Sequence, residues 1–184
     1  MSEVNDKCLE VFPNWLGSLG DDLKTIVDVL KEEGLADDAK RYLLGGVNYL
    51  FKSLDLIPDG IDDIGYLDDA FVLRLAAKAA LECDMGIVDE AVRGRLESLS
   101  KGCGLLEDFL GENVYGRLDR YTRNLRKGAA RGRMVDELME NSRLKAELLD
   151  EAETFIEEFT APDFAKDEKN LIKLTAFFEA KLPK

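Results

Sequence analysis

Histidine is absent from this 184-residue sequence. Its absence removes the commonest general base near neutral pH and the commonest protein ligand of transition metals. Cysteine is scarce: the three present, at positions 8, 83 and 103, are odd in number and form no CxxC motif, which excludes a disulfide framework and a zinc ribbon. The glycine-rich motifs that bind nucleotides and the GxSxG motif of serine hydrolases are lacking too. We therefore predict no catalytic residue and no cofactor, and an enzyme is the less favoured interpretation.

Long hydrophobic runs are also lacking. The apolar run at residues 42–51 falls well short of the about 20 residues that a membrane-spanning helix needs. Residues 1–12 do not show the basic start and apolar centre of a signal peptide. Together with the unpaired cysteines, these absences predict a cytoplasmic protein with reduced thiols and no membrane span. Among the thiols, we expect Cys103 to be the more exposed one, because it lies between two glycines.

Positive charge is in the minority. The sequence has 25 lysines and arginines against 38 aspartates and glutamates, and its net charge is −13. This balance argues against nucleic-acid binding by the whole surface and against adsorption to anionic membranes. With 46% hydrophobic and 34% charged residues, the chain has the composition of a globular protein.

Apolar residues recur at helical spacing along most of the chain, and no useful segment alternates as a strand would. The pattern predicts an all-α, compact domain of about seven or eight helices around a central helical hairpin. Residues 1–128 form the helical domain that contains the hairpin, and residues 129–184 form a C-terminal helical pair, expected to pack on the same domain. We predict one long helix from about residue 134 to 159, and possible interruptions of an earlier helix at Gly111 and Gly116.

The hairpin at residues 41–81 organises the prediction. Two apolar helical runs flank the sequence IPDG at residues 57–60, in which proline presets φ, aspartate bonds the nearby backbone and glycine relieves the exit. Gly45 and Gly46 in the first helix each cost about 1 kcal/mol relative to alanine. We expect close packing against the alanines at positions 76, 77, 79 and 80 to offset this cost. Arg74 and Lys78 are expected on the side opposite the apolar face.

Two motifs of the hairpin are specific enough to indicate a family. The string DLIPD at residues 55–59, followed by GYLDD at residues 65–69 and an apolar helix, resembles the YkvA-like domain of unknown function found in bacterial proteins. The motif residues are Asp55, Pro58, Asp59, Gly65, Tyr66, Asp68 and Asp69. The resemblance covers about a fifth of the chain. It implies an architecture and no particular reaction.

Aspartates crowd the turn and its flanks: Asp55, Asp59, Asp62, Asp63, Asp68 and Asp69. A turn that gathers carboxylates can bind Mg²⁺, Mn²⁺ or Ca²⁺, and the candidate ligands are Asp55, Asp59, Asp68 and Asp69. The alternative, which we favour, is that these side chains cap helices and bond the turn. Asp68 and Asp69 fall in the first turn of the returning helix, and Asp62 or Asp63 is in position to cap it. We expect Asp55, at the end of the first helix, to accept a backbone N–H across the turn.

Residues 116–133 form a basic stretch in this acidic chain. The basic residues are Arg117, Arg120, Arg123, Arg126, Lys127, Arg131 and Arg133, against the single acid Asp119. On a helix the first five lie on one side, which makes them candidates for binding phosphates or acidic lipid headgroups. The alternative, which we favour, is that these arginines pair with the acidic helices of the chain itself.

The leading functional hypothesis is a non-enzymatic helical interaction or scaffolding module whose partner is a protein. It would bind through apolar anchors at helical spacing with charged rims. Two alternatives stay open. One is a divalent-metal-dependent enzyme or metal-regulated module that uses the aspartates at 55–69, and the other is peripheral binding of nucleic acid or anionic lipid by the basic helix at 117–133.

Overall fold

The computed structural model describes residues 2–52, 55–61 and 63–184. Helices form nearly all of its regular structure, so the prediction of an all-α domain is confirmed. In chain order the helices are α1 (Glu3–Gly17), α2 (Leu19–Leu30), α3 (Asp37–Leu50), α4 (Leu67–Leu81), α5 (Glu90–Ser100), α6 (Cys103–Asn124), the 3-10 helix η1 (Leu125–Lys127), α7 (Val135–Glu140), α8 (Ser142–Glu158) and α9 (Glu168–Lys181). Strands β1 (Ala129–Ala130) and β2 (Arg133–Met134) pair antiparallel as a very small hairpin between η1 and α7. No helix in the described part of the chain is long and apolar enough to cross a membrane.

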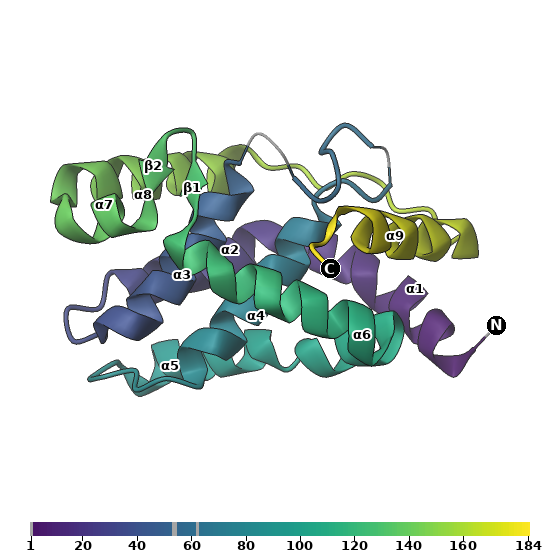
Figure 1. Ribbon diagram of the computed structural model, residues 1–184, viewed down its shortest axis with the longest axis horizontal. Coiled ribbons are helices and arrows are strands. Elements are labelled where there is room, and N and C mark those ends of the chain that lie inside the picture. Colours follow the sequence, from purple (N-terminus) through teal and green to yellow (C-terminus); the bar gives the residue numbers. More distant parts are fainter. Residues whose placement is uncertain (1, 53–54, 62) are drawn as a thin grey trace.

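The predicted helical hairpin is the centre of the fold. Helices α3 and α4 pack against each other, and α4 also contacts α1, α2, α5 and α6 (Figure 1). Nearly every residue of α4 is buried as a result. A helix surrounded in this way needs apolar side chains on all its faces, which accounts for its sequence.

The two adjacent glycines of α3 make two different close contacts. A Cβ atom at Gly46 would lie 2.8 Å from the Cβ of Ala76, which confirms the expected approach of α3 to an alanine of α4. A Cβ at Gly45 would instead lie 2.8 Å from the carbonyl carbon of Leu125. Gly45 therefore admits the backbone of η1, a neighbour about 80 residues away that helical periodicity does not reveal.

One of the two predicted interruptions of α6 is present. The backbone of Gly111 is non-helical, with φ 71° and ψ 160°, whereas Gly116 lies in regular helix. The long helix predicted from residue 134 to 159 is wrong, because Asn141 divides it into α7 and α8. The Asn141 side chain accepts hydrogen bonds from the backbone N–H groups of Arg143 and Leu144, at 3.0 and 3.2 Å, and so begins a new helix as its N-cap.

The C-terminal helices contact separate parts of the preceding body. Helix α8 packs against α2, whereas α9 packs against α1 and α6 (Figure 1). Phe178 of α9 stacks on Phe71 of α4 with ring centroids 5.6 Å apart, and both rings are fully buried. Phe178 thereby joins the last helix to the core of the central hairpin.

Candidate functional site

Asp68 is the buried polar centre of the hairpin. It has no exposed surface, and its Oδ2 accepts a hydrogen bond from the Tyr49 hydroxyl at 2.5 Å and another from the backbone N–H of Ile57 at 3.0 Å. The Tyr49 oxygen in turn accepts from the backbone N–H of Leu56 at 2.9 Å. Tyr49 belongs to α3, Asp68 to α4, and the two N–H groups to the segment between them. One carboxylate therefore holds both helices and their connection together.

Asp55, Asp59 and Asp69 lie within electrostatic reach of this centre. Burial is the main cause that raises the pKa of Asp55 to about 6 and that of Asp68 to about 7. Burial also raises the pKa of Asp59, and burial followed by the charge of Asp68 holds the pKa of Asp69 well above its ordinary range. Carboxylates that cannot all ionise together retain a proton. Burial and mutual repulsion therefore both favour retention of a proton by this group.

The same four aspartates are the predicted metal ligands, and their fit to a cation can be examined. Asp55, Asp68 and Asp69 each have an Oδ1 atom that is buried without a hydrogen-bond partner among the described residues. Such oxygens are satisfied by a cation or by a proton. Yet across residues 2–52, 55–61 and 63–184, no three His, Cys, Asp or Glu side chains are placed to hold a metal ion together. Without three converging ligands among those residues, the arrangement fits a shared proton better than a divalent cation.

The expectation that aspartates cap α4 is wrong for the residues that the structure describes. The N-cap position is Tyr66, whose backbone is left-handed with φ 67°, and no side chain caps the helix there. Asp63 instead accepts a hydrogen bond at 3.3 Å from the amide of Asn170, which lies in α9. Asp62 lies outside the described residues. Asp68 and Asp69 do lie in the first turn of α4, as predicted, and Asp68 uses its carboxylate to bind Tyr49 and Ile57.

Asp55 also differs from expectation. Helix α3 ends at Leu50, so Asp55 is part of the connection and not of the helix end. Its Oδ1 has no partner in the described part of the chain, and the bond across the turn to a backbone N–H is made by Asp68. Asp68 thus makes the backbone contact that was predicted for Asp55, while it keeps its own predicted place in the first turn of α4.

The remaining motif residues shape the connection between α3 and α4. The backbone N–H of Ile61 donates to the carbonyl of Pro58 at 3.0 Å, and that of Gly65 donates to the carbonyl of Ile61 at 2.8 Å. A Cβ at Gly65 would lie 2.4 Å from the carbonyl oxygen of Asp59, so no larger residue fits this coil. Tyr66 then packs edge-on against Phe159 of the segment after α8, with centroids 5.3 Å apart.

The first half of the predicted basic face is used within the chain. Arg117 donates to the carbonyl oxygens of Glu179 and Pro183, at 3.1 and 3.0 Å, and so satisfies the carboxyl end of α9. Arg123 pairs with Asp119 at 2.7 Å and with Glu82 at 2.5 Å. These arginines are consequently held by partners of their own chain.

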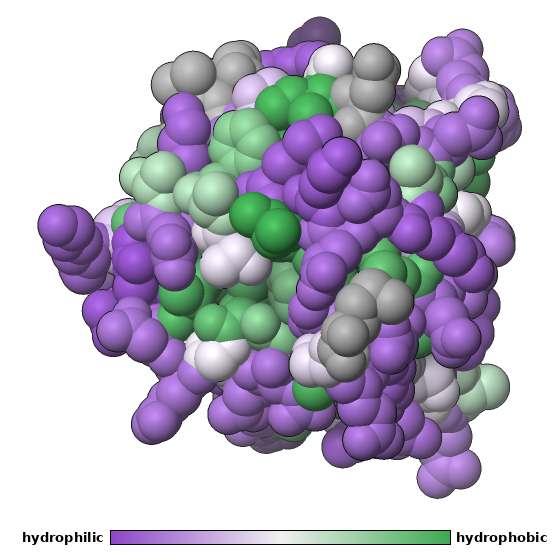
Figure 2. Space-filling view, turned by 90° about the vertical axis from the view of Figure 1, so that its right-hand side faces the viewer, coloured by the Kyte–Doolittle hydropathy of each residue, from purple (hydrophilic) through white to green (hydrophobic). Residues whose placement is uncertain are grey.

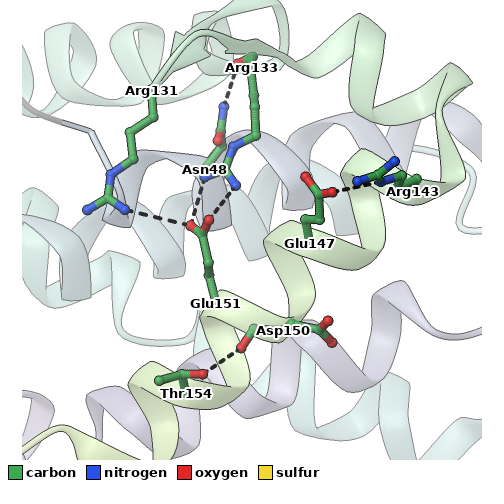
Figure 3. A network of polar contacts seen from close by, with 8 residues as sticks. All are labelled: Asn48, Arg131, Arg133, Arg143, Glu147, Asp150, Glu151 and Thr154. Carbon is green, nitrogen blue, oxygen red and sulfur yellow. Dashed lines mark hydrogen bonds and ion pairs between the residues drawn. The ribbon is translucent and has the colours of Figure 1, made fainter.

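The last two arginines of the basic stretch, Arg131 and Arg133, both approach Glu151 of α8 (Figure 3). Arg133 forms two bonds of 2.9 Å with the carboxylate of Glu151, and Arg131 approaches the same carboxylate at 3.9 Å. Arg126 lies over the ring of Tyr42, 5.1 Å from its centroid. Arg120 and Lys127 make no ion pair within the described residues. Binding of an external anion by this stretch stays a prediction, and these two side chains are its candidates.

Sequence reasoning missed an ion pair in the core. Arg74, expected on the outer side of α4, is only 3% exposed. Its guanidinium pairs with Asp22 of α2 at 2.8 Å and lies over the indole of Trp15 at 4.1 Å. Lys78, one turn further on, donates to the hydroxyl of Tyr115 at 3.0 Å. The sequence feature that could have indicated the burial of Arg74 is that α4 has too few polar residues to form a solvent-facing side.

The cysteines correct a further expectation. Cys103 is 4% exposed, and burial raises the pKa of its thiol, like that of Cys8, to about 12. Its neighbour Gly102 explains the burial, because a Cβ there would lie 2.8 Å from Trp15 and 2.9 Å from Arg74. Thiols that stay protonated at neutral pH are poor nucleophiles.

Function must accordingly be argued from these sites themselves, since a fold alone does not determine what a protein does. The resemblance of residues 55–69 to the YkvA-like domain stays a prediction. Comparison with protein-family models, with curated proteins and with solved structures gives no match.

Proposed function

We propose that this chain is a cytoplasmic, non-enzymatic interaction module that binds a basic amphipathic helix of a partner protein. The binding site is the groove between α1, α6 and α9. The single observation that carries the proposal is Ile172 of α9, which is 64% exposed at the edge of this groove. The three reduced cysteines support the cytoplasm as the compartment, and the resemblance to the YkvA-like domain supports the hairpin as its structural centre.

The groove has an apolar floor that continues into the core. Its volume is about 350 Å³, and the apolar side chains that line it include Phe109, Leu171 and Ile172. Phe109 meets the fully buried Phe12 edge-on, with centroids 5.3 Å apart, so the floor is fixed by core packing. Figure 2 shows apolar side chains gathered in the middle of this end of the molecule, with hydrophilic side chains around them. A rigid apolar floor with a polar surround is the usual form of a groove that accepts a helix.

Charge determines the chemistry of the partner. The helical segments that frame the groove, at residues 2–9, 105–113 and 168–179, carry more carboxylates than amines. The acids are Glu3, Asp6, Glu107, Asp108, Glu112, Glu168 and Glu179, and the bases are Lys7, Lys169 and Lys173. This excess, on a chain of net charge −13, attracts a cationic segment and repels a second copy of the same chain. The occupant is therefore a basic helix with an apolar stripe.

The test uses a fluorescent synthetic helix of leucine and lysine, with the leucines on one face, and follows its fluorescence anisotropy. A scrambled peptide of the same composition keeps the charge and loses the apolar stripe. We expect the amphipathic peptide to bind more tightly than the scrambled one, also at high salt, where the contribution of charge is screened. Ile172→Ala should weaken binding by about tenfold, because roughly 1.5 kcal/mol of apolar burial is lost.

Ile87 provides a matched control, because it is an exposed isoleucine outside the groove, with 86% of its surface accessible. Ile87→Ala should bind the peptide like the wild type. Equal losses in the two variants, or equal binding of the scrambled peptide, would overturn the proposal. So would self-association of the free chain that Ile172→Ala abolishes, since the occupant would then be a second copy.

A divalent cation bound by the aspartates is the second candidate, favoured by the unpartnered oxygens of Asp55, Asp68 and Asp69. Thermal unfolding with Mg²⁺, Mn²⁺ or Ca²⁺, compared with a chelator, tests it. A cation at 100 times its Kd adds about 2.7 kcal/mol of stability, or roughly 5–10 °C for a chain of this length. The shift must disappear in Asp68→Asn/Asp69→Asn. Without a shift in the wild type, only the proton remains as the occupant.

A further inference from the structure

A second cleft lies between α1, α2, α4 and α5, away from both the aspartates and the groove. Its volume is about 480 Å³, within the range of small-molecule sites. Five side chains define its chemistry: Trp15, Asp22, Arg74, Arg95 and Leu99. None of them belongs to the hairpin motif or to the groove. The cleft is therefore an independent feature of the fold.

Arg74 lines this cleft, and its guanidinium is fixed in place by its neighbours. Its guanidinium donates to the carbonyl of Ala70 and to Asp22, each at 2.8 Å, and lies over the ring of Trp15. These two bonds use two of the five N–H groups that a guanidinium carries. Burial lowers the pKa of Arg74, which means that Asp22 does not fully replace the lost water. An additional acceptor at the remaining N–H groups would complete its solvation.

Both arginines of the cleft are paired with carboxylates. Arg74 pairs with Asp22, and Arg95, which comes from α5, pairs with Asp28 at 3.1 Å, so these four charges balance in a chain whose net charge is −13. About half of the Arg95 side chain is exposed, and its other N–H groups are accessible to a ligand. A cleft that lacks the acidic excess of the rest of the chain and offers guanidinium N–H groups favours an anion.

Helix α5 leaves space for that ligand. Three of the residues that it turns toward the cleft are small: Ala91, Gly94 and Ser98. A Cβ added at Gly94 would meet no atom within 4 Å, so the space beside it is open. Trp15 and Leu99 supply apolar surface in the same cleft.

We propose that this cleft binds a small organic anion, whose carboxylate or phosphate group accepts hydrogen bonds from Arg74 and Arg95. The apolar remainder of the anion packs against Trp15 and Leu99. Oxyanions of this kind match the planar donor geometry of guanidinium groups. The proposal stands independently of the groove between α1, α6 and α9.

Trp15 provides the assay, because it is the chain's single tryptophan and lines the cleft. The probes are benzoate and phenyl phosphate, with benzamide as the neutral counterpart of similar shape. Tryptophan fluorescence and isothermal titration calorimetry should both report saturable binding of at least one of the two anions. Benzamide should bind about tenfold more weakly or not at all, because it lacks the charge that the arginines recognise. The anion that binds identifies the headgroup.

Gly94→Leu should abolish binding, because the leucine fills the cleft while the open space around Gly94 lets the helix fold. Gly104→Leu is the matched control, since Gly104 is a helical glycine with no atom within 4 Å of its Cβ position and lies outside the cleft. Arg95→Gln should weaken binding several-fold, and Arg93→Gln, on the same helix, should not. Retained binding in Gly94→Leu, or no binding of either anion to the wild type, would overturn the proposal.

Discussion

Neutralising the buried carboxylates of the hairpin should remove most of the protein's pH dependence of stability near neutrality. The perturbation is the double substitution Asp68→Asn/Asp69→Asn, which preserves side-chain shape and the acceptor oxygen of Asp68. In the wild type, burial raises the pKa of Asp68 in the folded state to about 7, from an ordinary value of 3.8. The folded protein therefore binds more protons than the unfolded chain over this range. Its stability must then fall as the pH rises from about 4 through 7.

The size of the effect follows from that pKa. Each unit of pKa difference is worth 1.36 kcal/mol, so the rise of roughly three units for Asp68 corresponds to about 4 kcal/mol in all. Between about pH 5 and pH 7 the wild type should lose about 2 kcal/mol, or roughly 4–8 °C in Tm for a chain of this length. Asp69, whose pKa is also raised, extends the loss to higher pH. The double variant should therefore be the more stable protein above neutral pH.

The assay is thermal unfolding followed by the helical circular dichroism signal at a series of pH values. The sequence makes it selective, because no histidine titrates between about pH 5 and 8. Glu157→Gln/Glu158→Gln is the matched control, since these adjacent acids of α8 are exposed. The control should keep the wild-type slope. Equal slopes in the wild type and Asp68→Asn/Asp69→Asn, or a wild type that gains stability between pH 5 and 7, would refute the reasoning.

Two further substitutions test the packing around α3. Tyr49→Phe removes the hydroxyl that donates to Asp68 and accepts from the backbone N–H of Leu56. Because two buried polar groups lose their partner, the free energy of unfolding measured by chemical denaturation should fall by about 2–4 kcal/mol. A loss below about 1 kcal/mol would contradict this role. Gly46→Ala should destabilise by about 1–3 kcal/mol, because its Cβ would lie 2.8 Å from that of Ala76. Gly94→Ala, at an open helical position, should instead stabilise the protein by up to about 1 kcal/mol. If Gly46→Ala also stabilised the protein, helix propensity and not packing would determine the effect of alanine at position 46.

Local patterns in the sequence are sufficient to predict the helical class and the central hairpin. Apolar spacing identifies helices because the pattern reflects the face that each helix buries. The approach of Gly46 to Ala76 is predictable for a similar reason, since the cost of a mid-helix glycine calls for a close neighbour. The break at Asn141 escaped the same analysis, because apolar residues continue at helical spacing on both sides of it.

The chemistry of the side chains was harder to predict, because it depends on partners distant in sequence. Arg74 pairs with Asp22, 52 positions earlier, and no spacing rule links the two. Arg117 satisfies carbonyl groups at the end of α9, whereas the sequence favoured ion pairs with the acidic helices of the chain. A basic side chain in an acidic protein meets many possible partners, and only the folded arrangement selects among them.

Helix α4 carries two unusual buried polar groups, the guanidinium of Arg74 and the carboxyl groups of Asp68 and Asp69, and they differ in their hydrogen-bond partners. Arg74 has a partner in Asp22, whereas Asp68 and Asp69 each retain a buried oxygen without one among the described residues. Buried charges seldom improve stability over apolar residues of the same volume, so neither group is required for α4 to form. Departures from local rules are most expected where a protein binds something. For Asp68 and Asp69 the pH profile measures a shared proton, and unfolding with divalent cations tests the alternative occupant. For Arg74 the proposed occupant is an anion, and Trp15 reports it. If the anion binds equally well to Asp68→Asn/Asp69→Asn, the two sites on this one helix work independently.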